Sequence, residues 1–179
     1  YINGEHLLAY HQSHSFNLND LLSNKLKNST GFHNVSGKMY VRFPSNTSPN
    51  KHTVTVPRYT TGITIDKQNY IHIKGIEFSY YGYKQYHQGI YMNNASYNLV
   101  ENCIFHHNGK GIGIKRGSNF NTFQNNSVSN SPIFKWSFEA MKGSKGYEEG
   151  AFSIYSSNIP NRGNVVRYNY FEESGDGVH

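Results

Sequence analysis

Two adjacent cationic residues, Lys115 and Arg116, directly follow the short alternating segment Gly111-Ile112-Gly113-Ile114. Removing a proton beside a carboxylate requires a base and a positive charge that neutralises the carboxylate. A pair of cations at the end of one strand is suited to that chemistry. The alternative is a solvated turn in which neither side chain takes part in a reaction.

Two carboxylates form a second candidate site. Glu149 and Asp176 each precede a glycine that opens a repeated segment, so their backbones are expected about 4.8 Å apart. Two carboxylates at such a short distance either bind a cation such as Ca²⁺ or share a proton. The spacing is also similar to the roughly 5 to 5.5 Å of a retaining glycosidase pair. Lys142 and Lys145 would instead neutralise the two charges in a purely structural arrangement.

A repeat that starts at Gly62 must position these residues. Each repeat opens with glycine and alternating apolar residues, and a second apolar pattern with Asn or an equivalent residue at its centre follows. The openings start at Gly62, Gly89, Gly111, Gly150 and Gly177, and the centres of the second pattern are Ile76, Cys103, Asn126 and Asn169. Short strands at this period are typical of a solenoid whose coils bury one another. The sequence therefore predicts an all-β fold, a right-handed parallel β-helix over residues 59–179.

Alternation along the opening strands assigns the residues that point outward. Tyr91, Asn93 and Tyr155 are expected on one surface, where aromatic rings stack on sugars and amides bind hydroxyl groups. Trp136, in an insertion before the fourth repeat, is expected to form a wall of this groove. His179 lies in the outward row and is an alternative base. The aromatic residues would otherwise serve only to pack the insertion on the coils.

Equivalent residues of successive coils are expected to form ladders along the axis. Asn126 and Asn169 would stack, and their amides would bond main-chain groups at a bend. Cys103 shares their position and is therefore expected to be a small buried apolar residue rather than a nucleophile.

Residues 1–58 lack the repeat and are predicted to form a small N-terminal α+β flanking segment. Apolar spacing from Leu18 to Leu26, behind Asn residues that favour helix starts, predicts one short helix. Alternation predicts two strands, at Lys38–Phe43 and Thr53–Val56.

Composition limits the classes of partner and location. The 179 residues carry 17 Lys and Arg against 11 Asp and Glu, and this charge of +6 suits acidic partners. The basic residues are scattered, so nucleic-acid binding is not expected. The single cysteine excludes an internal disulfide, and no apolar stretch is long enough to predict a membrane span. Because the last residues open another repeat, self-assembly through open β-helix ends is also expected.

The glycine openings, with the continuations Asn98–Phe105 and Asn164–Phe171, resemble the parallel β-helix repeats of carbohydrate-active proteins. That group includes polysaccharide lyases, hydrolases, uronate epimerases and phage tailspikes. The resemblance implies an extracellular or cell-surface protein that binds an acidic polysaccharide and cleaves it by β-elimination. Lys115 would then be the base, and Arg116 would bind the carboxylate. A glycoside hydrolase that uses the two carboxylates, or a non-catalytic adhesin, tailspike or surface-layer segment, are the alternatives.

The Lys115-Arg116 strand also resembles the Leu-Thr-Leu-Arg-His-Gly strand of alginate lyases similar to chondroitinase B. Those enzymes take a lysine from one coil and an arginine from the next. This sequence differs from that pattern, because its preceding coil has Asn93-Asn94 at the corresponding position.

Overall fold

The computed structural model describes residues 1–10, 16–25, 30–82, 87–131, 151–155, 158–174 and 177–178. These residues belong to two compact units. One lies within residues 1–56, and the other comprises residues 57–131 and 151–178. The sequence pattern predicts this division two residues later, after residue 58.

The first unit contains the predicted helix as α1 (Leu18–Leu22). Asn17 caps it, because its side-chain oxygen accepts hydrogen bonds from the backbone N–H groups of Asn19 and Asp20. The Asp20 carboxylate accepts a bond from the Asn17 N–H at 2.9 Å in return. This reciprocal capping box satisfies donors that a short helix otherwise leaves free. The helix is shorter than the predicted stretch to Leu26, because Ser23 caps it and residues 23–25 form a turn, while residue 26 lies outside the described residues.

A β-hairpin follows the helix. β1 (Gly31–Val35) pairs antiparallel with β2 (Lys38–Arg42), which confirms the first predicted strand of this segment. The turn residues Ser36 and Gly37 have φ of 50° and 73°. Left-handed backbone at both positions favours a tight hairpin, and this Ser-Gly signal could have revealed β1 in the sequence.

The strand predicted at Thr53–Val56 is wrong. Only Val54 pairs, in a single bridge with Ile2. The hairpin partner of β2 is the preceding segment. Residues 53–55 instead meet the N-terminal segment, which turns back between Ile2 and Glu5, so the pairing ends after one bridge and no strand forms. The 3₁₀ turns η2 (Pro44–Asn46) and η3 (Pro49–Lys51) lie between them and β2.

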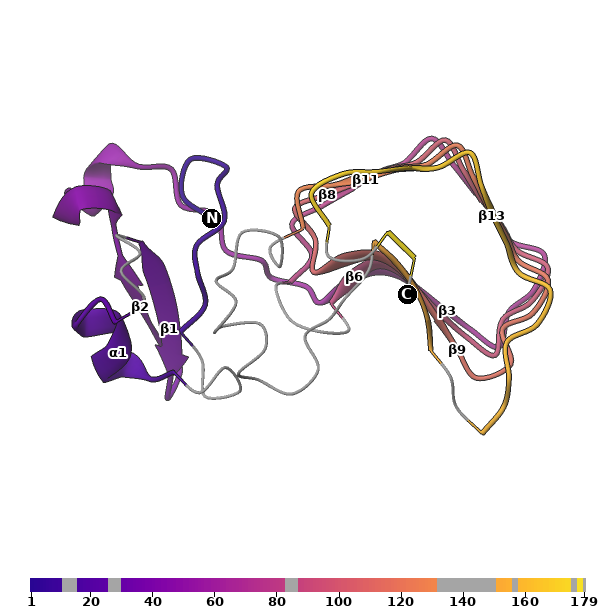
Figure 1. Ribbon diagram of the computed structural model, residues 1–179, viewed down its shortest axis with the longest axis horizontal. Coiled ribbons are helices and arrows are strands. Elements are labelled where there is room, and N and C mark those ends of the chain that lie inside the picture. Colours follow the sequence, from indigo (N-terminus) through magenta and orange to yellow (C-terminus); the bar gives the residue numbers. More distant parts are fainter. Residues whose placement is uncertain are drawn as a thin grey trace. The chain divides into compact units, whose positions relative to one another are not determined.

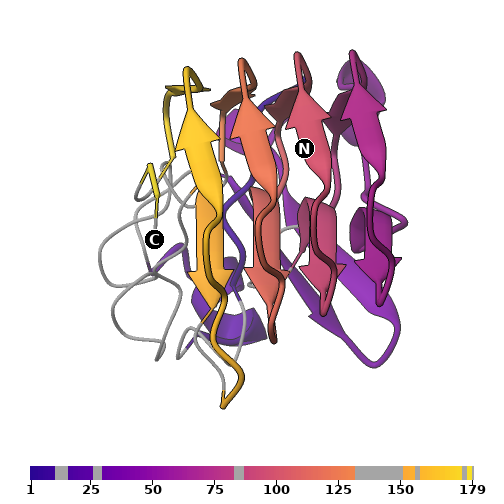
Figure 2. The same cartoon turned by 90° about the vertical axis from the view of Figure 1, so that its right-hand side faces the viewer.

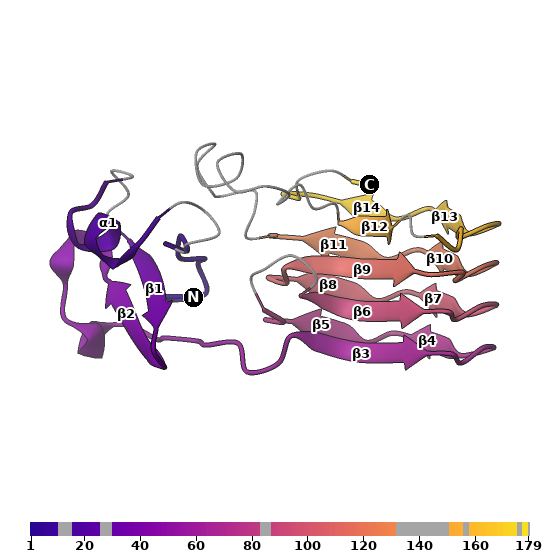
Figure 3. The same ribbon diagram turned by 90° about the horizontal axis from the view of Figure 1, so that it is seen from below.

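The second unit is the predicted parallel β-helix. Each full coil contributes one longer and two shorter strands to three parallel four-stranded sheets. Successive coils superimpose when viewed along the axis (Figure 1), lie side by side from magenta to yellow in Figure 2, and stack in sequence order in Figure 3. The long strands are β3 (Thr61–Asp66), β6 (Gln88–Asn93), β9 (Lys110–Lys115) and β12 (Phe152–Tyr155). The second sheet comprises β4 (His72–Lys74), β7 (Leu99–Glu101), β10 (Thr122–Gln124) and β13 (Val165–Arg167). The third comprises β5 (Glu77–Ser79), β8 (Ile104–His106), β11 (Ser127–Ser129) and β14 (Tyr170–Phe171).

The core lies inside the coils, where equivalent apolar side chains stack on one another. Phe78 and Phe105 stack with ring centroids 4.8 Å apart. The opening glycines make room for this layer: a Cβ on Gly89 would lie 2.5 Å from the Phe105 ring, and one on Gly111 would lie 2.8 Å from a backbone oxygen. The opening glycines Gly62, Gly89 and Gly111 are therefore required by the close approach of their own coil's third strand and of the next coil's backbone.

Four ladders of left-handed residues turn the chain at the corners of each coil. Their members have φ between 43° and 64°. The ladders, in chain order, are Lys67, Asn94 and Arg116; Tyr70, Tyr97, Phe120 and Gly163; Gly75, Asn102, Asn125 and Tyr168; and Tyr80, His107, Asn130 and Glu173. Asn and Gly tolerate this conformation, whereas bulky side chains adopt it at a cost of about 1 to 3 kcal/mol each.

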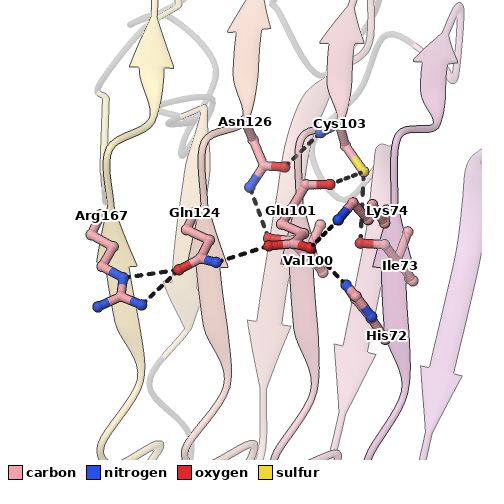
Figure 4. Close-up of polar contacts among 9 residues, drawn as sticks. All are labelled: His72, Ile73, Lys74, Val100, Glu101, Cys103, Gln124, Asn126 and Arg167. Atoms are coloured by element: carbon pink, nitrogen blue, oxygen red, sulfur yellow. Dashed lines mark hydrogen bonds and ion pairs between the residues drawn. The ribbon is translucent and has the colours of Figure 1, made fainter.

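Buried asparagines tie the coils together inside two of the bends. Asn126 accepts a hydrogen bond from the Cys103 N–H and donates one to the Val100 carbonyl, as Figure 4 shows. Asn169 repeats this arrangement one coil later, accepting from the Asn126 N–H. The expected asparagine ladder is confirmed, and Cys103 is buried as expected.

A second asparagine ladder was not predicted. Asn98, Asn121 and Asn164 stack before the second strand of successive coils. Asn121 is fully buried, accepts from the Asn98 N–H, and donates to the Ala95 carbonyl and to the Asn164 side chain. These amides satisfy main-chain groups that neither sheet reaches.

Candidate functional site

The outer face of the long-strand sheet carries the polar residues singled out from the sequence. Parallel register aligns them in rows across the coils. The rows are Gln88 and Lys110; Thr64, Tyr91, Gly113 and Ser153; and Asp66, Asn93, Lys115 and Tyr155. This register agrees with the predicted alternation, including the one-residue offset of the fourth opening.

Lys110 is the most unusual side chain on this face, because it is a lysine with only 1% of its surface exposed. Its ammonium lies 4.3 Å from the centre of the Tyr155 ring, and that of Lys115 lies 5.5 Å from the same ring. Burial, together with the positive charge of Lys115, lowers the pKa of Lys110 to about 7. A large fraction of the Lys110 amine is therefore neutral at physiological pH, as a general base requires.

Gly113 forms the hollow that admits these groups. A Cβ on this glycine would collide with the side-chain oxygen of Gln88 and lie 3.4 Å from the Tyr155 ring. The glycine therefore lets an amide and an aromatic ring approach the strand at its centre. Any larger residue would displace them from the outer face.

Several polar atoms in this region are buried without a hydrogen bond. They are Gln88 Oε1, Ser153 Oγ and Asn93 Oδ1, none of which has a partner in the described part of the chain. The amide nitrogen of Asn93, in contrast, donates to Asp66 at 2.5 Å. Buried polar groups are nearly always satisfied, so these three indicate where water or the hydroxyl groups of a ligand would bind.

The structure brings some of the predicted site residues together and separates others. Lys115 and Tyr155 are register partners, and Tyr91 and Asn93 lie on the neighbouring strand. Arg116 is an exposed corner residue with φ of 53°, one position beyond the strand.

Lys110, rather than Arg116, is the second cation against Tyr155. Alternation from the opening glycine Gly111 directs Lys110 outward as well, but nothing in a single sequence indicates that an outward lysine is buried. The opening glycine that follows it marks only its position in the coil.

The remaining predicted site residues, Trp136, Glu149, Asp176 and His179, lie outside the described residues. The calcium site on Glu149 and Asp176 therefore stays a prediction. Among the residues that the structure does describe, no three His, Cys, Asp or Glu side chains come together as a metal site would require.

The second sheet carries a separate polar network on its outer face (Figure 4). Glu101 is at its centre, with Lys74 Nζ at 3.0 Å, His72 Nε2 at 3.1 Å and a hydrogen bond of 2.8 Å from Gln124. Arg167 donates two bonds to the Gln124 oxygen, at 3.0 and 2.7 Å. Gln124, then Lys74 and His72, hold the pKa of Glu101 at about 2. The carboxylate is fully engaged, so this network links coils rather than forming a reactive site.

Glu101→Gln is expected to reduce the loss of folding stability that the protein shows as the pH falls below 4.5. A carboxyl group with a lowered pKa stabilises the fold above its ordinary pKa of 4.5, and this contribution is lost as the pH falls toward about 2. Melting temperatures at pH 2 to 7 should fall more steeply below pH 4.5 for the wild type than for the variant. The exposed Glu172→Gln variant is the control, and equal acid slopes for wild type and Glu101→Gln would contradict the expectation.

Comparison with known proteins identifies the repeat. A family model described as "Right handed beta helix region" matches residues 7–179, nearly the whole chain. The comparisons with curated proteins and with solved structures returned no match. No helix in the described ranges has the length and apolar character needed to cross a membrane. The handedness of the family agrees with the predicted solenoid, and the chain belongs to the right-handed β-helix family.

Proposed function

We propose that the outer face of the long-strand sheet binds a uronate-containing polysaccharide and cleaves it by β-elimination. The observation that carries this proposal is the pair of lysines against Tyr155, one buried and one half-buried. The two amines supply the two functions that the reaction needs, a base and a partner for the carboxylate. Because the polymer is a component of cell walls and matrices, we also propose that the protein acts outside the cell or at its surface.

Lys110 is the base in this mechanism. Its neutral amine removes the proton from C5 of the uronate while the ammonium of Lys115 neutralises the adjacent carboxylate. The electron pair of the broken C5–H bond forms the C4=C5 double bond, and the C4–O glycosidic bond breaks. The leaving oxygen takes a proton from water. This assignment differs from the sequence hypothesis, in which Lys115 was the base and Arg116 bound the carboxylate.

The polar groups around Gly113 support a sugar as the ligand. Gln88 Oε1 can accept a hydrogen bond from a hydroxyl group, and Ser153 Oγ can both donate and accept. Tyr91 and Tyr155 add aromatic surface of the kind that packs on pyranose rings. An anionic polymer also suits a chain with a net charge of +6.

Incubation with polyuronates and neutral polysaccharides, with Ca²⁺ or chelator, tests the proposal. We expect ultraviolet absorbance of the new double bond to rise together with reducing ends, on uronate polymers only. The rate should rise with pH through about 7, since the base must lose its proton. Reducing ends without absorbance would replace elimination by hydrolysis, and no product on any polymer would contradict catalysis.

A further inference from the structure

The second corner of the coils carries bulky aromatic residues in a conformation that disfavours them. Tyr70, Tyr97 and Phe120 have φ of 60°, 57° and 54°, and the fourth coil has Gly163 at the same position. The next corner uses glycine and asparagine in three of its four coils. Residues that adopt left-handed backbone with less strain therefore fit this fold, so the aromatic residues at the second corner need an explanation other than backbone conformation.

The three rings form a continuous exposed stack along the axis, which we call the aromatic strip. Tyr70 and Tyr97 stack at 5.3 Å with an interplanar angle of 10°, and Tyr97 and Phe120 stack at 5.2 Å and 15°. Their residues are 77%, 50% and 51% exposed, respectively. Stacking uses the faces between the rings, so the strip presents mainly ring edges to solvent. Ring edges carry the positive part of the aromatic quadrupole.

A shallow groove of about 320 Å³ borders the aromatic strip on the second sheet. It is lined by Tyr97, Asn98, Leu99, Phe120, Thr122, Gln124 and Arg167. One arginine, Arg167, lies at its fourth-coil end. Arg167 is bound to Gln124, and Arg162 belongs to the corner next to Phe120, whose N–H bonds the Arg162 carbonyl at 2.9 Å. The groove thus combines positive ring edges, hydroxyl and amide groups, and guanidinium charge.

We propose that the aromatic strip and its groove are a second, non-catalytic binding surface for an anionic polysaccharide. Carboxylate or sulfate groups bind Arg167, and sugar oxygens contact the ring edges and the polar groups of Thr122 and Gln124. The strip lies at a corner of the coils and its groove on a different sheet from Lys110, so they hold the polymer without taking part in its cleavage. The choice of polymer rests on the proposed function, whereas the existence of the surface does not.

A single-stranded nucleic acid fits the same surface less well. Proteins bind bases by stacking them on free aromatic faces. In the aromatic strip the inner faces are already stacked on one another, and the outer face of Phe120 lies against Gly163, where a Cβ would collide with the ring. Edge contacts and guanidinium groups favour oxyanions on a sugar chain over bases.

Tyr97→Asn and Phe120→Asn test the proposal. Asparagine is favourable in left-handed backbone, so both variants should melt at or above the temperature of the wild type. Affinity for polygalacturonate or dextran sulfate, measured by retardation in native gels and by calorimetry, should fall about tenfold for each ring removed. A comparison of the affinities for the two polymers shows whether the surface prefers carboxylate or sulfate groups. A purely structural ring would show the opposite pattern, with lower stability and unchanged binding.

The same measurements in a Lys110→Met background separate this surface from the proposed active site. Binding through the aromatic strip should persist there and still be lost on Phe120→Asn. Lys51→Gln, at an exposed position in the other unit, is the charge control, and Arg167→Gln should weaken binding more than Lys51→Gln does. Three outcomes would each overturn the proposal. The first is unchanged affinity of both Asn variants, and the second is binding of uncharged dextran as tight as that of the anionic polymers. The third is tighter binding of oligothymidylate that is lost on Phe120→Asn. The elimination assay fails or succeeds independently of these outcomes.

Discussion

Lys110→Met is expected to melt at a higher temperature than the wild type at pH 7 and to lose elimination activity. The pKa of Lys110 falls from 10.5 to about 7 on folding, so the unfolded chain holds this proton more tightly than the folded one. Folding with a charged lysine therefore costs on the order of a few kcal/mol, which methionine of similar shape avoids. Loss of a general base should lower the rate by about 10² to 10⁴-fold.

The pH dependence of this stability difference has a defined sign. Since the unfolded state binds more protons between about pH 7 and 10.5, the stability of the wild type rises with pH across this window. The advantage of Lys110→Met in calorimetric melting should shrink accordingly. Lys51→Met, at an exposed position of η3, is the control and should show neither effect. A less stable Lys110→Met variant would mean that the charge is well paired, and full activity would place the base elsewhere.

Asn121→Leu is expected to destabilise the coils strongly, although it places an apolar side chain in the core. Its side chain makes bonds with the Asn98 N–H, the Asn98 and Asn164 side chains and the Ala95 carbonyl, all inside the coils. Leucine would leave at least two buried main-chain groups unsatisfied, at about 1 to 3 kcal/mol each. Urea unfolding should therefore show a loss of about 3 to 5 kcal/mol.

The control for this experiment is Asn158→Leu, at an exposed bend of the same unit. It should change the free energy of unfolding by no more than about 0.5 kcal/mol. Asn121→Asp keeps the acceptor but places a second oxygen against the Ala95 carbonyl and the Asn164 oxygen, so a loss at least as large as that of leucine is expected at pH 7. If leucine at position 121 were tolerated as well as at 158, the asparagine ladder would not be a determinant of coil stability.

Features that depend on the repeat period could be predicted from the sequence. The openings at Gly62, Gly89 and Gly111 are in phase with the second pattern, and this phase determines both register and the division into inward and outward residues. The Asn126 ladder followed from the same phase. The ladder through Asn98 and Asn164 had a comparable signal, because both residues begin the continuations that identified the repeat.

Features that depend on neighbours across coils could not be predicted. Lys110 and Lys115 look alike in the sequence, but only the first is enclosed, since Gly113 lets Tyr155 and Gln88 lie beside it. Alternation of apolar and polar residues also led to a wrong prediction at residues 53–56, where the pattern suits a strand but no neighbouring strand is present. Pattern specifies which way a side chain points, whereas burial and pKa depend on what lies next to it.

The direction of the hydrogen bonds makes the coil stack mechanically anisotropic. Bonds between coils in all three sheets, and those of the asparagine ladders, run along the solenoid axis. Tension along that axis loads these bonds directly and peels the end coil from its neighbour, one coil at a time. Tension across the axis loads the covalent chain of each coil instead. A force directed across the side walls therefore acts in the direction in which the coil stack is hardest to unravel.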